Sequence, residues 1–332
     1  RDVFTNTTFG NETHPDDLIV LTVYSGSVFD QHLFKGFKCF NRLELRYGSS
    51  NANVPYKAFY GMESLQGELE IPSSFSTINE YAFSGCGFHQ IIFNSYPTLK
   101  EGAFYNCKNL NDTINLGGIS TIPKRGFAGC SNLQSITFAQ SNIPTFERSA
   151  FEDCSSLDFD VKLPHQDEIP GGTEPTDYTI HKYAFSGCSS LEGTDGHLVI
   201  RRYVKTIDDY AFQGCAFQHL EFDLDRSKTS GGITDSNKLT LGTGAFANCN
   251  QLRFELILPE LTDDKIPDRS FMGCSGIQHI EYANSIKTIG KYAFYGCSGV
   301  TGQLEIMPSV KRIEEYAFAK CTGYSGSLTI NV

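Results

Sequence analysis

The chain has 332 residues, of which 40% are hydrophobic and 20% charged, and a formal net charge of −11 at pH 7. This acidic balance argues against nucleic acid and anionic membrane surfaces as partners, since both attract basic proteins. The most apolar stretch, residues 18–23, is far shorter than the roughly 20 apolar residues of a membrane-spanning helix, so we expect no membrane span.

The chain opens on a polar segment, residues 1–17, which we interpret as an N-terminal leader or a partial capping repeat. It begins at Arg1 without a methionine, as a processed or trimmed product does. Two N-glycosylation sequons lie here, at Asn6 and Asn11, and a third lies at Asn111. Such triplets also arise by chance, but the first two fall close together in a polar leader, so all three asparagines are candidate glycosylation sites.

The rest of the chain, residues 18–332, repeats a short phrase that is clearest in TINEYAFSGC, TIDDYAFQGC and TIGKYAFYGC. A unit of about two dozen residues cannot enclose a core alone, so we expect a single stack of about 12 repeats. The phenylalanine of the phrase recurs at Phe34, Phe59, Phe83, Phe104, Phe127, Phe151, Phe185, Phe212, Phe246, Phe271, Phe294 and Phe318.

Each repeat has fixed apolar positions. An apolar residue stands five positions before every phenylalanine, and cysteine stands three positions after it in ten repeats. An alternating apolar pair follows, which indicates a half-buried strand. We therefore expect a strand, a turn, an apolar residue that can sit on a second extended segment, and a tight helical turn. The expected buried ladder includes Phe83, Cys86, Phe127, Cys130, Phe212, Cys215, Phe294 and Cys297.

Parallel strands stacked about 4.8 Å apart with right-handed crossovers predict a right-handed solenoid with a parallel β-sheet along one face. The apolar strand pair followed by I-x-x-x-A-F-x-x-C resembles the leucine-rich repeats of the BspA-like class, which occur in bacterial surface proteins and in several protists. The resemblance covers residues 18–332 and implies a leucine-rich-repeat superhelix that serves in adhesion or recognition at a cell surface. The first copy departs most, because Phe37 takes the cysteine position and Cys39 lies two residues beyond it.

The chain has 11 cysteines, and ten of them occupy one equivalent position of the repeat. We expect a buried column of free thiols. Disulfides between neighbouring repeats are the alternative, because the spacing near 5 Å meets the distance criterion although the geometry is poor. Zinc binding by cysteine is not expected, since no C-x-x-C pair occurs.

Between the two inward positions of each strand lies one residue that must face outward. Glutamate fills this position five times and lysine once, at Lys162, so the sheet face is expected to carry an acidic strip. The strip is either an ordinary solvated face or a docking surface for a basic protein. Its candidate ligand-binding residues are Glu44, Glu70, Glu221, Glu281 and Glu305.

Three insertions interrupt the regular period, at residues 164–179, 192–196 and 223–238. The first and third follow strands two repeats apart, so we expect both loops at the same edge, and long loops often carry function. A calcium site in the third is not expected, because Lys228 stands where the turn glycine of such a loop belongs. The candidate binding residues in these loops are Asp167, Glu168, Glu174, Asp225 and Arg226.

Catalysis needs unlike groups that converge in a pocket, whereas a solenoid presents like groups in rows. His219 and His279 precede strands two repeats apart, which is too far to share a metal ion. We therefore expect no catalytic residue, no cofactor and no metal. A row of tyrosines two positions before the phenylalanine indicates packing on the convex side or an adhesive aromatic stripe, at Tyr81, Tyr183, Tyr210, Tyr292 and Tyr316.

Two functions remain. The first is a non-enzymatic extracellular or cell-surface module that binds a protein ligand, such as a host surface protein, through its sheet face or loops. The second is a structural subunit of an extracellular filament or surface coat that self-associates through the solenoid ends or edges, since such contacts propagate without closing. The chain stops at GSLTINV on a strand without a polar cap, so we expect further chain or a partner there.

Overall fold

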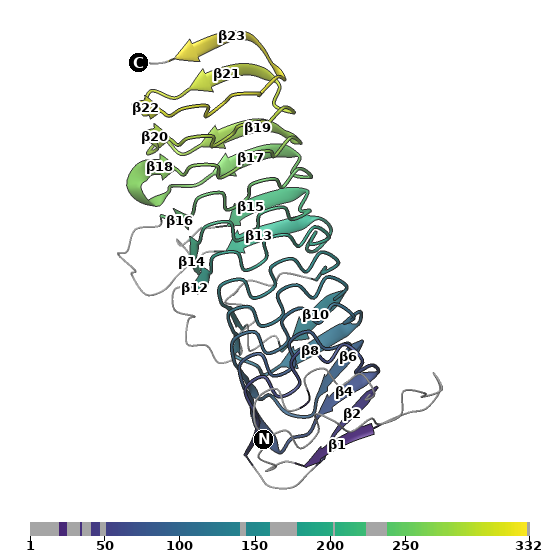
Figure 1. The fold of residues 1–332 in the computed structure, drawn as a ribbon. Helices are drawn as coiled ribbons and strands as arrows, with labels where there is room; N and C mark the ends of the chain where they lie inside the picture. Colours follow the sequence, from purple (N-terminus) through teal and green to yellow (C-terminus); the bar gives the residue numbers. More distant parts are fainter. Residues whose placement is uncertain are drawn as a thin grey trace.

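The computed structural model describes residues 20–24, 34, 41–46, 51–139, 144–159, 178–201, 203–223 and 238–330. The chain winds as an elongated solenoid, with β1 at one end and β23 at the other (Figure 1). Every strand-to-strand pairing along it is parallel. Within the described residues no helix has the length and apolar character needed to cross a membrane.

One side of the solenoid carries the longer strands, which we call the front sheet (Figure 1). They pair two by two, in unbroken register for β4 with β6 and with a register shift for β17 with β19. The front strands are β1 (Val20–Tyr24), β2 (Arg42–Arg46), β4 (Glu68–Ile71), β6 (Gln90–Phe93), β8 (Thr113–Gly117), β10 (Ser135–Phe138), β13 (His197–Arg201), β15 (His219–Asp223), β17 (Phe254–Leu258), β19 (Ile277–Tyr282), β21 (Gly302–Ile306) and β23 (Tyr324–Ile330).

The opposite side carries shorter strands, which we call the back strands. They hold the apolar residue five positions before each phenylalanine from Phe59 to Phe318, so the second extended segment expected from the sequence is present there. The back strands are β3 (Ala52–Val54), β5 (Phe75–Ile78), β7 (Thr98–Leu99), β9 (Thr121–Ile122), β11 (Thr145–Phe146), β12 (Tyr178–Ile180), β14 (Val204–Ile207), β16 (Thr240–Leu241), β18 (Lys265–Ile266), β20 (Thr288–Ile289) and β22 (Arg312–Ile313).

The repeat number is smaller than expected from the sequence. About ten complete turns, rather than twelve, have both a front and a back strand among the described residues. The shortfall arises because β1 has no described back strand, and β12 has no described front strand before it. Likewise, the described residues include no back strand after β23.

The expected helical turns are wrong. The segment with phenylalanine and cysteine is a series of β-turns, in which Ala82 and Ser84 donate backbone hydrogen bonds to carbonyls three residues back, both at 3.2 Å. The alternate N–H groups, of Tyr81, Phe83 and Gly85, instead donate to the next repeat at 2.9, 2.9 and 2.7 Å. A helix cannot form because Tyr81 (φ +55°) and Gly85 (φ +72°) are left-handed. In the described residues, the single helical element is the 3-10 turn η2 (Thr262–Asp264).

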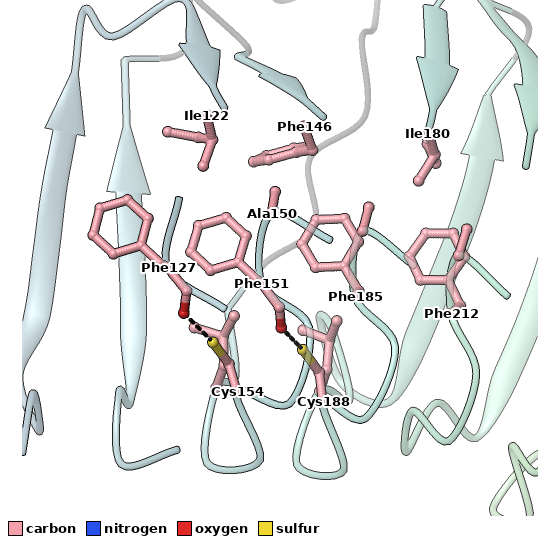
Figure 2. Close-up of a cluster of buried hydrophobic side chains, with 14 of the residues drawn as sticks. Ile122, Phe127, Phe146, Ala150, Phe151, Cys154, Ile180, Phe185, Cys188 and Phe212 are labelled. Atoms are coloured by element: carbon pink, nitrogen blue, oxygen red, sulfur yellow. Dashed lines mark hydrogen bonds between the residues drawn. The ribbon is translucent and has the colours of Figure 1, made fainter. Parts of the chain in front are cut away.

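The phenylalanines form a continuous stack through the core, part of which is shown in Figure 2. Successive rings lie 5.2 to 5.9 Å apart between centroids and are tilted by only 4° to 16°. Phe83, Phe127, Phe212 and Phe294 are fully buried. Each ring therefore packs against the turns before and after it, which couples neighbouring repeats.

The cysteines form a second column beside the rings. Each thiol donates a hydrogen bond to the phenylalanine carbonyl of the preceding repeat, as from Cys154 to Phe127 at 3.1 Å and from Cys188 to Phe151 at 3.1 Å (Figure 2). The ten cysteines among the described residues are free, so the disulfide alternative is not realised there. Burial raises the pKa of most of these thiols, including Cys86, Cys130, Cys215 and Cys297.

Several predictions from the sequence fall on residues outside the described ranges. These are the segment 1–17 with Asn6 and Asn11, Cys39, Lys162, and the loop residues Asp167, Glu168, Glu174, Asp225 and Arg226. Two ends of the insertions belong to strands and not to loops, in contrast to the bounds expected from the sequence. Tyr178 and Thr179 belong to β12, and Asp223 ends β15. The small insertion closes a tight turn in which the His197 N–H donates to Thr194 O at 2.9 Å.

Candidate ligand-binding surface

The five outward glutamates do not form one continuous strip. Glu44 lies between Arg42, at 3.6 Å, and Arg46, and these two cations neutralise it. Glu70 accepts a hydrogen bond from Asn94 at 2.6 Å and is opposite Ile92 on the next strand. The acidic character of this half of the sheet is therefore weak.

The other three glutamates lie on the later strands. Glu221, Glu281 and Glu305 are all exposed on the outer face of β15, β19 and β21. Glu221 is opposite Val199, and Glu281 is opposite Ile257, which is 53% exposed. This half of the sheet combines carboxylates with exposed apolar surface.

A row of imidazoles runs beside these glutamates, one outward position earlier along the strands. His197 and His219 occupy matching positions of β13 and β15, and their rings stack with centroids 4.2 Å apart and an angle of 8°. The ring of Phe254 extends the stack, 5.0 Å from His219 and tilted by 13°. Burial, followed by the neighbouring charges of His197 and Arg253, lowers the pKa of His219.

A β-bulge lies next to Phe254, between β17 and β19. The register between β17 and β19 shifts between Phe254 and Glu255, so that Phe254 is opposite Ile277 and Glu255 is opposite His279. Phe254 takes a left-handed backbone conformation (φ +62°) and is 50% exposed. The same backbone conformation recurs at Tyr81 and Tyr210 in the repeated turns, so it is the exposure of Phe254 that sets this position apart from those two.

The bulge also assembles a polar cluster. His279 Nε2 lies 3.3 Å from Glu281 Oε1 and 3.9 Å from Glu255 Oε1. We call the surface formed by His197, His219, Phe254, Glu255, Ile257, His279 and Glu281 the histidine patch. Its stacked rings, carboxylates and exposed apolar side chains can bind a partner through packing, hydrogen bonds and charge.

Sequence reasoning placed Glu281 on this surface and missed most of its neighbours. It compared His219 only with His279, although β17 lies between their strands. The signal was present, because His197, His219, Glu255 and His279 all directly precede an inward apolar residue. The stacking of Phe254 could not be read from the sequence, since strict alternation would put Phe254 and Ile257 on opposite faces of the strand.

A second candidate site is a polar groove at the corner before the early front strands. The groove has a volume of about 270 Å³ and is lined mainly by amide side chains and His89. Asn111 is exposed on its wall, and the adjacent Asp112 carboxylate accepts the Thr113 N–H at 2.7 Å. The Asn111 sequon is thus accessible at its asparagine.

The tyrosine row lies beside the back strands. Tyr183 stacks on Tyr210 at 5.3 Å, and Tyr292 stacks on Tyr316 at 5.1 Å. Tyr81 donates a hydrogen bond to Glu101 at 2.8 Å. Only Tyr316 among the five is more than half exposed, at 52%. Both expected roles of this row, packing and adhesion, stay open.

Stacked parallel strands with a front sheet and a core ladder in every turn make the chain a leucine-rich-repeat solenoid. It belongs to the BspA type leucine-rich repeat family, whose model matches residues 28–160, 174–232 and 239–331 in 6 copies. The family assignment made from the repeated motif is therefore confirmed.

Three solved structures are similar to this chain. A leucine-rich repeat protein from Bacteroides ovatus is 17% identical, with a TM-score of 0.55 over 93% of this chain and 86% of that chain. A leucine rich cell surface protein from Faecalibacterium prausnitzii is 22% identical, with a TM-score of 0.49 over 92% and 83%. A leucine-rich repeat protein from Eubacterium ventriosum is 15% identical, with a TM-score of 0.48 over 88% and 84%. No curated protein matches the chain.

Proposed function

We propose that this chain is a non-enzymatic extracellular or cell-surface module that binds a protein ligand through the histidine patch. The observation that carries the proposal is the exposed row of stacked rings, in which His197, His219 and Phe254 lie 4.2 and 5.0 Å apart and Phe254 is 50% exposed. Such a row is available for contact with a partner. Membership of the BspA type leucine-rich repeat family supports a role in recognition at a surface.

The chemistry of the patch favours a basic protein partner with an apolar contact. Phe254 and Ile257 supply two exposed apolar side chains on one strand. Glu221, Glu281 and Glu305 border them on the neighbouring strands, in a chain of net charge −11. Charge complementarity of this kind steers association and selects partners, while buried aromatic contacts supply most of the affinity.

Replacing both Phe254 and Ile257 by serine is expected to weaken ligand binding by at least about tenfold, because central aromatic contacts dominate interface energies. The measurement is capture of surface proteins from host or neighbouring-cell extracts, followed by titration of the captured protein. Tyr56→Ser is the matched control, since Tyr56 is 37% exposed but lies remote from the patch beside β3. Equal binding by the double variant and the wild type would exclude the patch as the ligand site.

Charge reversal tests the electrostatic part separately. Changing Glu221 and Glu305 to lysine should slow association with a basic ligand and reduce its dependence on salt. If these two changes leave binding unaffected, the apolar contact remains supported but a basic partner is excluded.

A second candidate function is a structural subunit of an extracellular filament or surface coat. It is favoured by the parallel strand pairs stacked along the whole solenoid, since contacts between the edges of such a stack propagate without closing. Sedimentation over a concentration series distinguishes the two functions. A filament subunit grows without limit, whereas a binding module stays monomeric.

A further inference from the structure

We propose that Glu255, His279 and Glu281 form a binding site for a divalent first-row transition metal ion of the zinc class. The three side chains project from the outer face of β17 and β19, and one ligand atom from each lies within 4.8 Å of the other two. All three residues belong to the histidine patch, but the proposal does not need the protein ligand proposed above. It departs from the expectation of no metal, which rested on histidine pairs, cysteine motifs and a calcium loop in the third insertion.

The distances between the ligand atoms suit a zinc ion. Zinc binds imidazole nitrogen and carboxylate oxygen at about 2.0–2.2 Å, so the edges of a tetrahedral site measure about 3.3–3.6 Å. His279 Nε2 lies 3.3 Å from Glu281 Oε1 and 3.9 Å from Glu255 Oε1. The first distance is already that of a site edge. Small rotations of the Glu255 side chain would bring the second to the same value.

The backbone holds the ligands in register. The bulge before Glu255 puts this residue directly opposite His279 on the paired strand. Glu281 follows His279 by two residues, so both side chains project from the same face of β19. Ligands on paired strands are positioned more rigidly than ligands on loops.

Charge also favours a cation at this point. The two carboxylates carry two negative charges, and among the residues that the structure describes His279 is the one ion-pair partner of either. Arg253, the nearby cation, donates to Gln251 at 3.4 Å. A divalent ion would neutralise the cluster.

The donor set indicates which ion fits. One imidazole with two carboxylates matches zinc and its neighbours in the first transition row, whereas calcium and magnesium prefer sites built from oxygen alone. With three protein ligands the ion would keep a coordination position for water. All three residues are exposed, so this position would face solvent.

The test is calorimetric titration of the full chain with zinc chloride after treatment with a chelator. Wild type should bind one zinc ion per chain. Loss of a residue that only supports a metal ligand costs about 10–100-fold in affinity. His279→Ala removes a ligand itself, so it should weaken zinc binding by at least as much. Glu255→Gln and Glu281→Gln should each weaken it as well. Calcium chloride should give no binding at this site.

His219→Ala and His197→Ala are the matched controls, because these imidazoles lie in the same row but outside the cluster. Both variants should bind zinc as wild type does. The proposal is overturned if His279→Ala binds zinc with unchanged affinity, or if either control loses binding to the same extent. Melting curves of each variant without metal verify the fold, and binding of the protein ligand plays no part in the readout.

Discussion

Raising the pH above about 9 is expected to unfold the protein cooperatively. Burial raises the pKa of nine thiols of the cysteine column above the ordinary value of 9.0, to about 12 for Cys249 and about 11 for the half-buried Cys321. Between the ordinary and the raised pKa the folded chain holds more protons than the unfolded chain. The contribution of these thiols to the free energy of unfolding is therefore fully present below pH 9 and decreases as the pH rises above it.

The expected loss is large because the thiols act together. Each contributes about 1.4 kcal/mol per pH unit in this window, so nine thiols contribute on the order of 10 kcal/mol per pH unit. Domains are typically stable by only about 5–15 kcal/mol. The alkaline midpoint should therefore lie within about one or two units above pH 9.

Far-ultraviolet circular dichroism across a pH titration measures this transition. A variant with Cys154→Ala and Cys188→Ala has two fewer buried thiols. Its stability should fall less steeply with pH, by about 3 kcal/mol per pH unit, after correction for its lower stability at pH 7. An unchanged urea midpoint between pH 8 and pH 10 would contradict the prediction.

Truncating Phe212 to alanine is expected to lower the free energy of unfolding by about 3–5 kcal/mol, because it leaves a cavity in the buried stack of phenylalanine rings. Phe212 stacks on Phe185 at 5.6 Å and on Phe246 at 5.5 Å. Coupling in repeat proteins is between nearest neighbours, so the damage should be centred on these three turns. Urea unfolding gives the total cost, and hydrogen exchange locates it.

Phe254→Ala is the matched control, since the same side chain is removed from a half-exposed site on the surface, outside the buried stack of phenylalanine rings. Phe254→Ala should lower the free energy of unfolding much less than Phe212→Ala does. Part of its effect is offset, because alanine is less crowded than phenylalanine in a left-handed backbone conformation. A cost below about 1 kcal/mol for Phe212→Ala would show that the stack does not hold the repeats together.

The sequence predicted the architecture well because the core positions are periodic. Ile207, Phe212 and Cys215 recur at fixed offsets, and all three are buried. The prediction of helical turns was wrong because the residues that exclude a helix lie outside the core pattern. Tyr210 and Gly214 both have positive φ, and the recurrent glycine two positions after the phenylalanine was the available signal.

The candidate site was only partly predictable. Alternation along the strands correctly indicated that Glu221 and Glu281 face outward. The stack of His197, His219 and Phe254 depends on how three strands are aligned, and one strand contains a bulge that no residue pattern announces. Repetition defines the core, whereas the surface features arise where single repeats depart from it.

The hydrogen bonds between turns have a mechanical consequence. They run along the long axis of the solenoid, in both sheets and in the turns of the ring stack (Figure 1). A pull on the two ends therefore loads one turn at a time instead of the whole molecule at once. Each turn that opens releases about two dozen residues, or about 80 Å of extended chain. A molecule built in this way lengthens in small steps under tension and absorbs work before it fails.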